Sequence, residues 1–200
     1  MNASTAEEPH VVPAAAEHAA GLAALFERNH VSCYCQWWHF DGDKNAWLDR
    51  CAHAPERNRD ALTNGLATGA EAMRGVVAID PGGSIVGWMK LAPASALGKI
   101  YEQRLYRRLP CFGGDRRGVY TIGCFFVDEP WRRRGVARAL VLGGIAAARA
   151  WGATAIECFP RRCEAARAEE LWTGPPDTFL AAGFAVVHDF EPYPVLRFML

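Results

Sequence analysis

Three consecutive arginines and a glycine, Arg132 to Gly135, are the residues whose types and spacing most directly suggest chemistry in this chain. They lie between an apolar run, 119–127, and a long run of small apolar residues that extends to Trp151. The first backbone N–H groups of a helix have no intrahelical partners, and the helix dipole adds partial positive charge there. Cationic side chains and a conformationally free glycine at such a position predict an anion-binding site. The alternative is a solvated basic helix end.

The segments on either side of this turn predict a strand, a helix and a second strand. Residues 119–127 are almost all apolar, with many β-branched and aromatic side chains, as is typical of a strand buried on both faces. The next run predicts a helix of about eighteen residues, or roughly 27 Å, whose apolar composition requires cover from a sheet. Residues 153–160 predict the second strand. The turn has neither the Walker nor the Rossmann spacing of glycines.

This stretch carries a family resemblance. The sequence Arg-Arg-Arg-Gly-Val-Ala, residues 132–137, resembles the [Gln/Arg]-x-x-Gly-x-[Gly/Ala] motif of the Gcn5-related N-acetyltransferase (GNAT) superfamily. Phe179 to Phe184 resembles the aromatic-x-x-x-Gly-Phe ending of the same family. The resemblance covers about Gly75 to Leu200. It implies a mixed α/β fold with a central, mostly antiparallel twisted sheet, a splayed parallel strand pair, and helices on both faces.

The resemblance also implies where acetyl-CoA binds as cosubstrate. The amides of the turn would hold its pyrophosphate, and the backbone of the preceding strand would hold the pantetheine arm and polarise the thioester carbonyl near Phe126 or Val127. The cofactor-binding residues implied in this way are Phe125, Phe126, Val127, Arg132, Arg133, Arg134, Gly135, Val136, Ala137 and Arg138.

The catalytic groups are harder to assign. Acetyl transfer to an amine requires loss of a proton from the amine and polarisation of the thioester carbonyl. The positions that match the frequent glutamate base and tyrosine acid of the resembled family are Gly123 and Phe179. Glu157 lies inside an otherwise apolar strand, where a carboxylate is costly unless it is paired or faces a cleft. It is therefore a candidate base or substrate anchor, with a structural ion pair to an arginine as the alternative, and Tyr193 is a weaker candidate acid.

The segment 30–40 is unusually rich in aromatic, cysteine and histidine residues. The resemblance favours Trp37 and Trp38 as walls of the acceptor pocket, and a packed aromatic wall without a substrate role is the alternative. The cysteines are expected to pack as small hydrophobic residues. A zinc site remains a lesser alternative because the Cys-x-Cys spacing departs from usual knuckles, so no metal is expected; its ligands would be His30, Cys33, Cys35 and His39.

The remaining pattern predicts a first helix, a second helix, a hairpin, a short helix and two closing strands. The long basic connection 93–118, with Tyr101 and Tyr106, either shapes the substrate site or is solvated surface. Lys90, within the hairpin, is expected to be an exposed surface charge. The predicted ranges are 13–28 and 55–66 for the helices, 74–80 with 84–92 for the hairpin, 99–108 and 175–182 for further helices, 161–170 for a short helix or a mobile flap, and 184–188 with 195–200 for the strands.

Composition places the chain among ordinary globular proteins. Of the 200 residues, 50% are hydrophobic and 22% are charged, which predicts a single domain with residues 1–10 flexible. The formal net charge of zero gives no reason to expect a nucleic acid or an anionic membrane as partner. No apolar run is long enough to cross a membrane. Seven cysteines at irregular spacing favour a reducing cytoplasm over a disulfide framework.

The resulting hypothesis is a cytoplasmic, acetyl-CoA-dependent N-acetyltransferase, monomeric or homodimeric, that acts on a small-molecule amine. The amine would attack the thioester directly in a ternary complex, where proximity supplies most of the rate. A protein or peptide amine is the alternative acceptor. A second hypothesis, favoured by the missing glutamate and tyrosine, is a regulatory module that binds acyl-CoA without turnover.

Overall fold

The protein is built around one seven-stranded sheet. The computed structural model describes residues 9–162 and 171–200, and its strands lie in the order β1-β2-β3-β4-β5-β7-β6. All neighbouring strands pair antiparallel except β4 and β5, which are parallel. The strand bounds are β1 His10–Pro13, β2 Gly75–Ile79, β3 Ile85–Pro93, β4 Val119–Val127, β5 Ala155–Cys158, β6 Ala185–His188 and β7 Val195–Met199.

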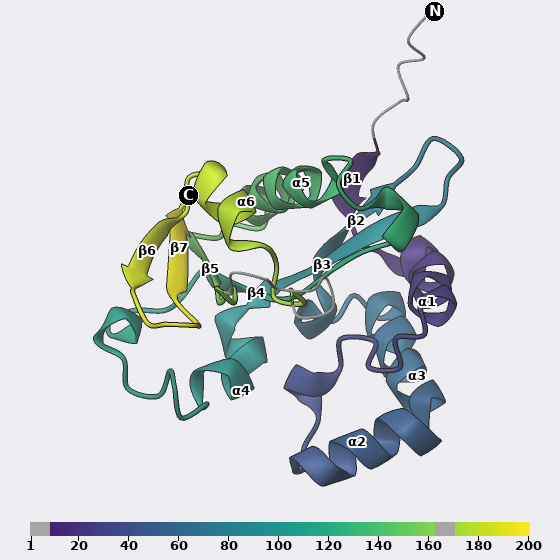
Figure 1. The fold of residues 1–200 in the computed structure, drawn as a ribbon, viewed down its shortest axis with the longest axis horizontal. Coiled ribbons are helices and arrows are strands. Elements are labelled where there is room, and N and C mark those ends of the chain that lie inside the picture. The colour runs from purple at the N-terminus through teal and green to yellow at the C-terminus, as the bar shows by residue number, and fades with distance from the viewer. Residues whose placement is uncertain (1–8, 163–170) are drawn as a thin grey trace, which may run out of the picture.

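Helices cover both faces of the sheet, so the predicted fold class is confirmed. Figure 1 shows α5 and α6 on one face, and α1, α3 and α4, with α2 beyond them, on the other. None of the helices in the described ranges is long and apolar enough to cross a membrane. The helix bounds are α1 Ala19–Arg28, α2 Lys44–His53, α3 Pro55–Ala67, α4 Gly98–Tyr101, α5 Val136–Ala150 and α6 Pro176–Ala181.

The apolar helix α5 lies directly on the sheet because small residues allow a close approach. A Cβ added at Gly143 would lie 2.4 Å from the Val11 side chain, and one added at Gly144 would lie 2.1 Å from the end of Met89. Larger residues at either position would push the helix away from β1 and β3. The covered strands β3 and β4 are consequently buried along almost their whole length.

The parallel pair splays after a short contact. β4 and β5 pair at only three positions, and the last of them joins Thr121 to Glu157. Beyond it, β4 continues alongside β3 as far as Val127, while β5 continues alongside β7. One edge of β4, from Ile122 onward, therefore faces a gap with no strand in it.

The elements nearest to the turn match their predictions best. β4 has the predicted bounds, the hairpin forms β2 and β3, and α5 begins directly after Gly135. The helix predicted over 13–28 is wrong at its start, because Pro13 belongs to β1 and a 3₁₀ turn precedes α1. Helix α2 was not predicted. Residues 1–8, and most of the helix predicted over 161–170, lie outside the described ranges.

One expectation about the cysteines is wrong. Cys35, in the loop after α1, forms a disulfide with Cys124 on β4, with their Cα atoms 6.2 Å apart. The sulfur of Cys35 also accepts a hydrogen bond from the indole N–H of Trp88 at 3.3 Å. Spacing along the chain gave no sign of this pair, because 89 positions separate its members. Four other cysteines in the described ranges are free thiols: Cys33, Cys51, Cys111 and Cys158.

The expectation that Lys90 is an exposed charge is also wrong. Lys90 lies on β3 with an exposed fraction of 0%, and its ammonium group contacts the sulfur of Met73 at 3.5 Å. Burial lowers the pKa of Lys90 to about 7. Burial, followed by the nearby Lys90, lowers the pKa of His39 to about 4. The central strand thus carries a lysine that burial drives toward its neutral form.

We predict that Lys90→Met raises the free energy of unfolding at pH 6.5, by roughly 2–5 kcal/mol, because the buried charge is removed. Below pH 7 the folded wild type carries this charge in its core, and between pH 7 and 10.5 only the unfolded chain is protonated. The cost of Lys90 is therefore greatest below pH 7 and is relieved as the pH rises toward 10.5. Urea unfolding at pH 6.5 and 9.5 should show the advantage of the variant shrinking at the higher pH.

The exposed Lys44 in α2 provides a matched control. Lys44→Met should change the free energy of unfolding by less than about 0.5 kcal/mol at both pH values. An advantage of Lys90→Met that does not depend on pH would contradict the lowered pKa of Lys90.

Candidate active site

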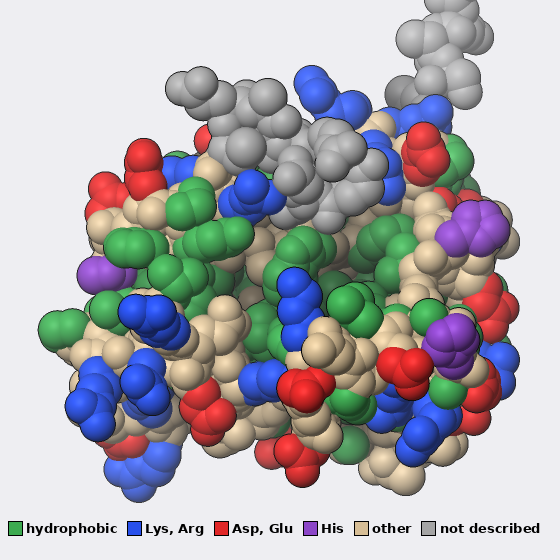
Figure 2. Space-filling view, turned by 60° about the horizontal axis from the view of Figure 1, so that its bottom comes forward, with side chains coloured by type: hydrophobic (Ala, Val, Ile, Leu, Met, Phe, Trp, Pro, Cys, Tyr) green, Lys and Arg blue, Asp and Glu red, His purple; other side chains and the backbone are tan. Residues whose placement is uncertain are grey.

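A cavity of about 230 Å³ opens at the point where β4 and β5 separate. Ile122 and Gly123 contribute from β4, and Phe159 contributes from the end of β5. The other lining residues come from the segments that contain α4, the 3₁₀ turn Trp37–His39 and the loops 171–174 and 189–194. In Figure 2, which brings the lower side of the view in Figure 1 forward, hydrophobic side chains gather around a hollow across the middle of the face.

The described lining of this cavity is rich in aromatic residues and carries no charge. Of its eleven residues, five are aromatic, three are aliphatic, two are polar and one is Gly123. Among the described residues, no Asp, Glu, Lys, Arg or His lines it. The aromatic members are Trp38, Tyr106, Phe159, Trp172 and Tyr193; the aliphatic members are Ile100, Leu105 and Ile122; and the polar members are Gln103 and Thr173.

Gly123 is the contact point between β4 and the loop that carries Trp38. The pairing of β3 with β4 shifts here, so that Gly123 forms a bulge without a partner on β3. Its carbonyl accepts a hydrogen bond from the indole N–H of Trp38 at 2.5 Å. A Cβ at this position would lie 3.1 Å from both Trp38 and Leu97. A side chain at position 123 would therefore require Trp38 and Leu97 to shift by a few tenths of an ångström.

The unpaired edge of β4 presents backbone groups to the gap. The N–H of Phe125 points away from β3 and donates to the carbonyl of Trp172 at 2.7 Å. The N–H of Asp128 points toward β3, where it donates a hydrogen bond to the carbonyl of Val86. Because successive residues of a strand alternate in direction, Val127 shares the orientation of Phe125, whereas Phe126 turns its backbone to β3. The ring of Phe126 instead stacks on Phe26, with their centroids 5.7 Å apart.

The basic turn lies at the far end of this edge. Gly135 caps α5 with a φ of 83°, and Arg133 also has a left-handed backbone with a φ of 62°. Arg133, Arg134 and Gly135 are exposed, and a Cβ at Gly135 would meet none of the described residues within 4 Å. Arg132 donates to the carbonyl of Val127 at 3.2 Å, which ties the turn to the strand. The start of α5, where backbone amides lack intrahelical partners, therefore lies beside two exposed arginines.

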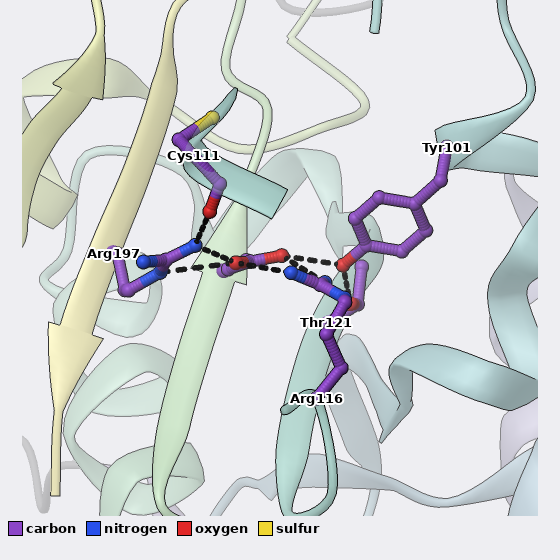
Figure 3. A network of polar contacts seen from close by, with 6 residues as sticks. Tyr101, Cys111, Arg116, Thr121 and Arg197 are labelled. Carbon is purple, nitrogen blue, oxygen red and sulfur yellow. Dashed lines mark hydrogen bonds and ion pairs between the residues drawn. The ribbon is translucent and has the colours of Figure 1, made fainter. Parts of the chain in front are cut away.

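Glu157 lies beneath the cavity and does not line it. Its carboxylate is fully buried, with an exposed fraction of 0%. Arg116 donates to one carboxylate oxygen at 2.7 Å, and Arg197 donates to the other at 2.5 Å. Tyr101 donates its phenol proton to Glu157 at 2.6 Å and forms a short hydrogen bond with Thr121. Figure 3 shows these partners converging from three sides on one central carboxylate.

The environment of Glu157 keeps it ionised. Burial alone would raise the pKa of the carboxyl, but hydrogen bonds from Arg116, Tyr101 and Arg197 outweigh it and hold the pKa below its usual range. Burial and the adjacent carboxylate raise the pKa of Tyr101, so its phenol stays protonated and remains a donor. A carboxylate with both oxygens bound and a lowered pKa is a weak base. This geometry favours the structural ion pair over the catalytic role for Glu157.

The other predicted site residues separate into two groups. Tyr193 and Trp38 line the same cavity, which brings the candidate acid beside the predicted acceptor wall. Trp37 does not line it; its ring packs on Trp47 at 5.5 Å and on the ammonium group of Lys99 at 3.7 Å. Phe179, at the position of the missing tyrosine, is fully buried against Phe125.

Sequence reasoning missed several residues of this site. Tyr106 and its neighbours come from the long connection 93–118, whose substrate-shaping role was one of two open alternatives. Trp172 and Thr173 gave no signal, because a turn was the only feature that the sequence predicted there. The zinc alternative finds no support in the described ranges, where no group of three or more potential ligands clusters.

Comparison with known proteins identifies the family. Residues 34–173, more than half of the chain, match the model of the acetyltransferase (GNAT) family, so the chain belongs to this family. No curated protein matches the sequence.

Solved structures of this family share the fold at low sequence identity. A GNAT family N-acetyltransferase (YhbS) from Escherichia coli, in complex with CoA, aligns with a TM-score of 0.53 and 16% identity, over 98% of this chain and 85% of that one. The PaiA N-acetyltransferase from Thermoplasma acidophilum, in complex with coenzyme A, aligns with a TM-score of 0.56 and 8% identity, over 97% of this chain and 100% of that one. A GCN5-related N-acetyltransferase from Kribbella flavida aligns with a TM-score of 0.55 and 18% identity, over 96% of this chain and 98% of that one.

We predict that Glu157→Gln lowers the free energy of unfolding by roughly 2–4 kcal/mol at pH 7, because two partly buried guanidinium groups lose the buried carboxylate that pairs with them. The folded-state pKa of Glu157 is lowered, so its contribution is present above the usual value of 4.5 and is lost as the pH falls through the folded-state pKa. Urea unfolding at several pH values should therefore show the gap between wild type and variant closing in acid.

The exposed ion pair between Glu71 and Arg74, at 2.8 Å, supplies the control. Glu71→Gln should cost less than about 1 kcal/mol because solvent screens that pair. If Glu157→Gln unfolded like the wild type while acetyl transfer was lost, the carboxylate would be a catalytic base and not a structural anchor.

Proposed function

We propose that this protein is an acetyl-CoA-dependent N-acetyltransferase that acts on an amine by direct attack in a ternary complex. The observation that carries the proposal is the open edge of β4, which runs from the aromatic cavity at Gly123 to the basic turn at Gly135. One strand thus connects a place for the acceptor with a place for an anionic cofactor. The CoA complexes of YhbS and PaiA, which share this fold, support acyl-CoA as the cosubstrate.

In this proposal the pyrophosphate binds the amides at the start of α5, and Arg133 and Arg134 neutralise its charge. The pantetheine arm lies along the gap and pairs with the backbone of Phe125 and Val127. The amide of Phe125 polarises the thioester carbonyl. Since this amide now donates to the carbonyl of Trp172, cofactor binding replaces that hydrogen bond.

The acceptor enters the cavity beside Trp38, and its nitrogen attacks the thioester carbon held at the splay. Tyr193 is the candidate that returns a proton to the leaving thiolate, since its phenol reaches the same cavity. A cavity of about 230 Å³ suits a small molecule better than a protein segment.

A regulatory module that binds acyl-CoA without turnover is the second candidate. The residues at positions 123 and 179, glycine and a buried phenylalanine, favour it because neither can exchange a proton. Release of free CoA in the presence of an amine separates the two candidates, since a regulatory module would bind acetyl-CoA and release none.

We predict that Gly135→Leu lowers the affinity for acetyl-CoA at least tenfold in titration calorimetry, because the new side chain obstructs the path of the pyrophosphate to the helix amides. The substitution also strains a left-handed backbone, at a cost of roughly 1–2 kcal/mol. Thermal unfolding should show that the variant still folds.

Gly152, just past the other end of α5, is a matched control. It has a φ of 74°, and its Cβ position is equally open. Gly152→Leu should therefore cause a similar loss of stability and leave acetyl-CoA affinity within twofold of the wild type. Equal losses of affinity in both variants would mean that strain, and not the site, explains the effect.

A further inference from the structure

The chemistry of the cavity wall restricts the kind of amine that can enter. None of the described residues that line the cavity carries a charge or a carboxylic acid. The nearest carboxylate considered above, Glu157, is fully buried and already bound by two arginines. Burial raises the pKa of Tyr106, so that its phenol remains neutral. The described part of the lining therefore offers a substrate rings, aliphatic groups and neutral polar groups.

An alkylammonium ion could rest against these aromatic faces, but it could not react there without a base. An amine with a pKa of about 10.4, like that of a lysine, is unprotonated in roughly one molecule in 2,500 at pH 7. To attack the thioester, it must first lose its proton. The described lining offers no carboxylate, imidazole or amine to take that proton. An amine that is already neutral in water avoids this obstacle.

The aromatic side chains of the cavity suggest the shape of the group to which the amine is attached. Trp38 and Trp172 lie with their centroids 5.6 Å apart and their planes inclined by 32°. Tyr106 and Phe159 form a second pair at 4.7 Å. Flat apolar groups gain from contact with such ring faces and edges. Tyr193, Thr173 and Gln103 remain available to orient a neutral nitrogen by hydrogen bonds.

We propose that the acceptor is a weakly basic amine attached to a flat aromatic body, the class of arylamines; this rests on the proposed N-acetyltransferase function. The nitrogen lone pair forms the C–N bond to the thioester carbon, the C–S bond breaks, and its electron pair leaves with sulfur. The nitrogen loses one proton after attack, when it has become strongly acidic, and the CoA thiolate gains one. The products are the N-aryl acetamide and free CoA thiol.

The test compares one arylamine with alkylamines that are more basic and carry aromatic, aliphatic or extended groups. The purified full chain is first titrated with acetyl-CoA, and thiol release is then measured with aniline, benzylamine, cyclohexylamine and spermidine. We expect kcat/KM for aniline to exceed that for the three alkylamines by at least a hundredfold at pH 7. We also expect kcat/KM for aniline to change less than threefold between pH 6.5 and 9, since aniline is neutral over this range and the proposed reaction uses no protein base.

The outcomes separate the inference from the function on which it rests. Absence of acetyl-CoA binding overturns the proposed function. Binding with turnover of an alkylamine as fast as, or faster than, aniline overturns the arylamine assignment and leaves the acetyltransferase in place. Binding without turnover of aniline also overturns the arylamine assignment. A rate for aniline that rises tenfold per pH unit would show that a protein base is required, contrary to the inference.

A variant tests whether the aromatic rings of the cavity bind the acceptor. Trp172→Ala removes one ring of the cavity but keeps the backbone carbonyl that contacts Phe125. It should raise KM for aniline about tenfold relative to the wild type. Phe190→Ala, at a similarly exposed aromatic residue that does not line the cavity, should leave KM for aniline unchanged. Equal KM values for the wild type and Trp172→Ala would contradict stacking on this ring.

Discussion

The buried carboxylate of Glu157 is the interaction on which the architecture of the site depends. A charge without access to water is tolerated only when partners surround it. Here those partners arrive from the end of α4, from the segment before β4 and from β7, in the side chains of Tyr101, Arg116 and Arg197. The network forms at the last paired position of β4 and β5, because Tyr101 also bonds Thr121, the residue opposite Glu157. It therefore fixes the point at which the two strands part.

Position 123 shows how one residue affects the packing of the side chains around it. The position that matches the glutamate base implied by the family resemblance is a glycine here. The indole of Trp38 lies close to it, and the indole N–H binds the carbonyl of Gly123. A side chain at this position would press on the indole, so the glycine that removes a base also allows the close approach of one aromatic residue of the cavity.

The features that were predicted correctly from the sequence are those that depend on residues close together along the chain. The bounds of β4, the turn at Gly135 and the helix after it follow from composition and spacing within about thirty residues, so pattern reasoning placed them well. The contacts that close the site join distant segments. Cys35 meets Cys124, and Arg197 meets Glu157, without any periodic signal that could pair them. Lys90 was misplaced for the same reason: alternation within one strand cannot reveal that other elements cover its polar face.

The two halves of the site are physically connected through one residue of the loop 171–174. The carbonyl of Trp172 accepts the Phe125 amide inside the gap, while its ring lies beside Trp38 in the cavity wall. A ligand that takes the Phe125 amide must displace this carbonyl, and displacing it moves the residue whose ring borders the acceptor. The exposed ring, at 45% of its full accessible area, has fewer contacts to resist that shift than the buried Trp38 on the opposite side. In the proposed function, a cofactor in the gap would therefore meet the same residue that borders the acceptor cavity.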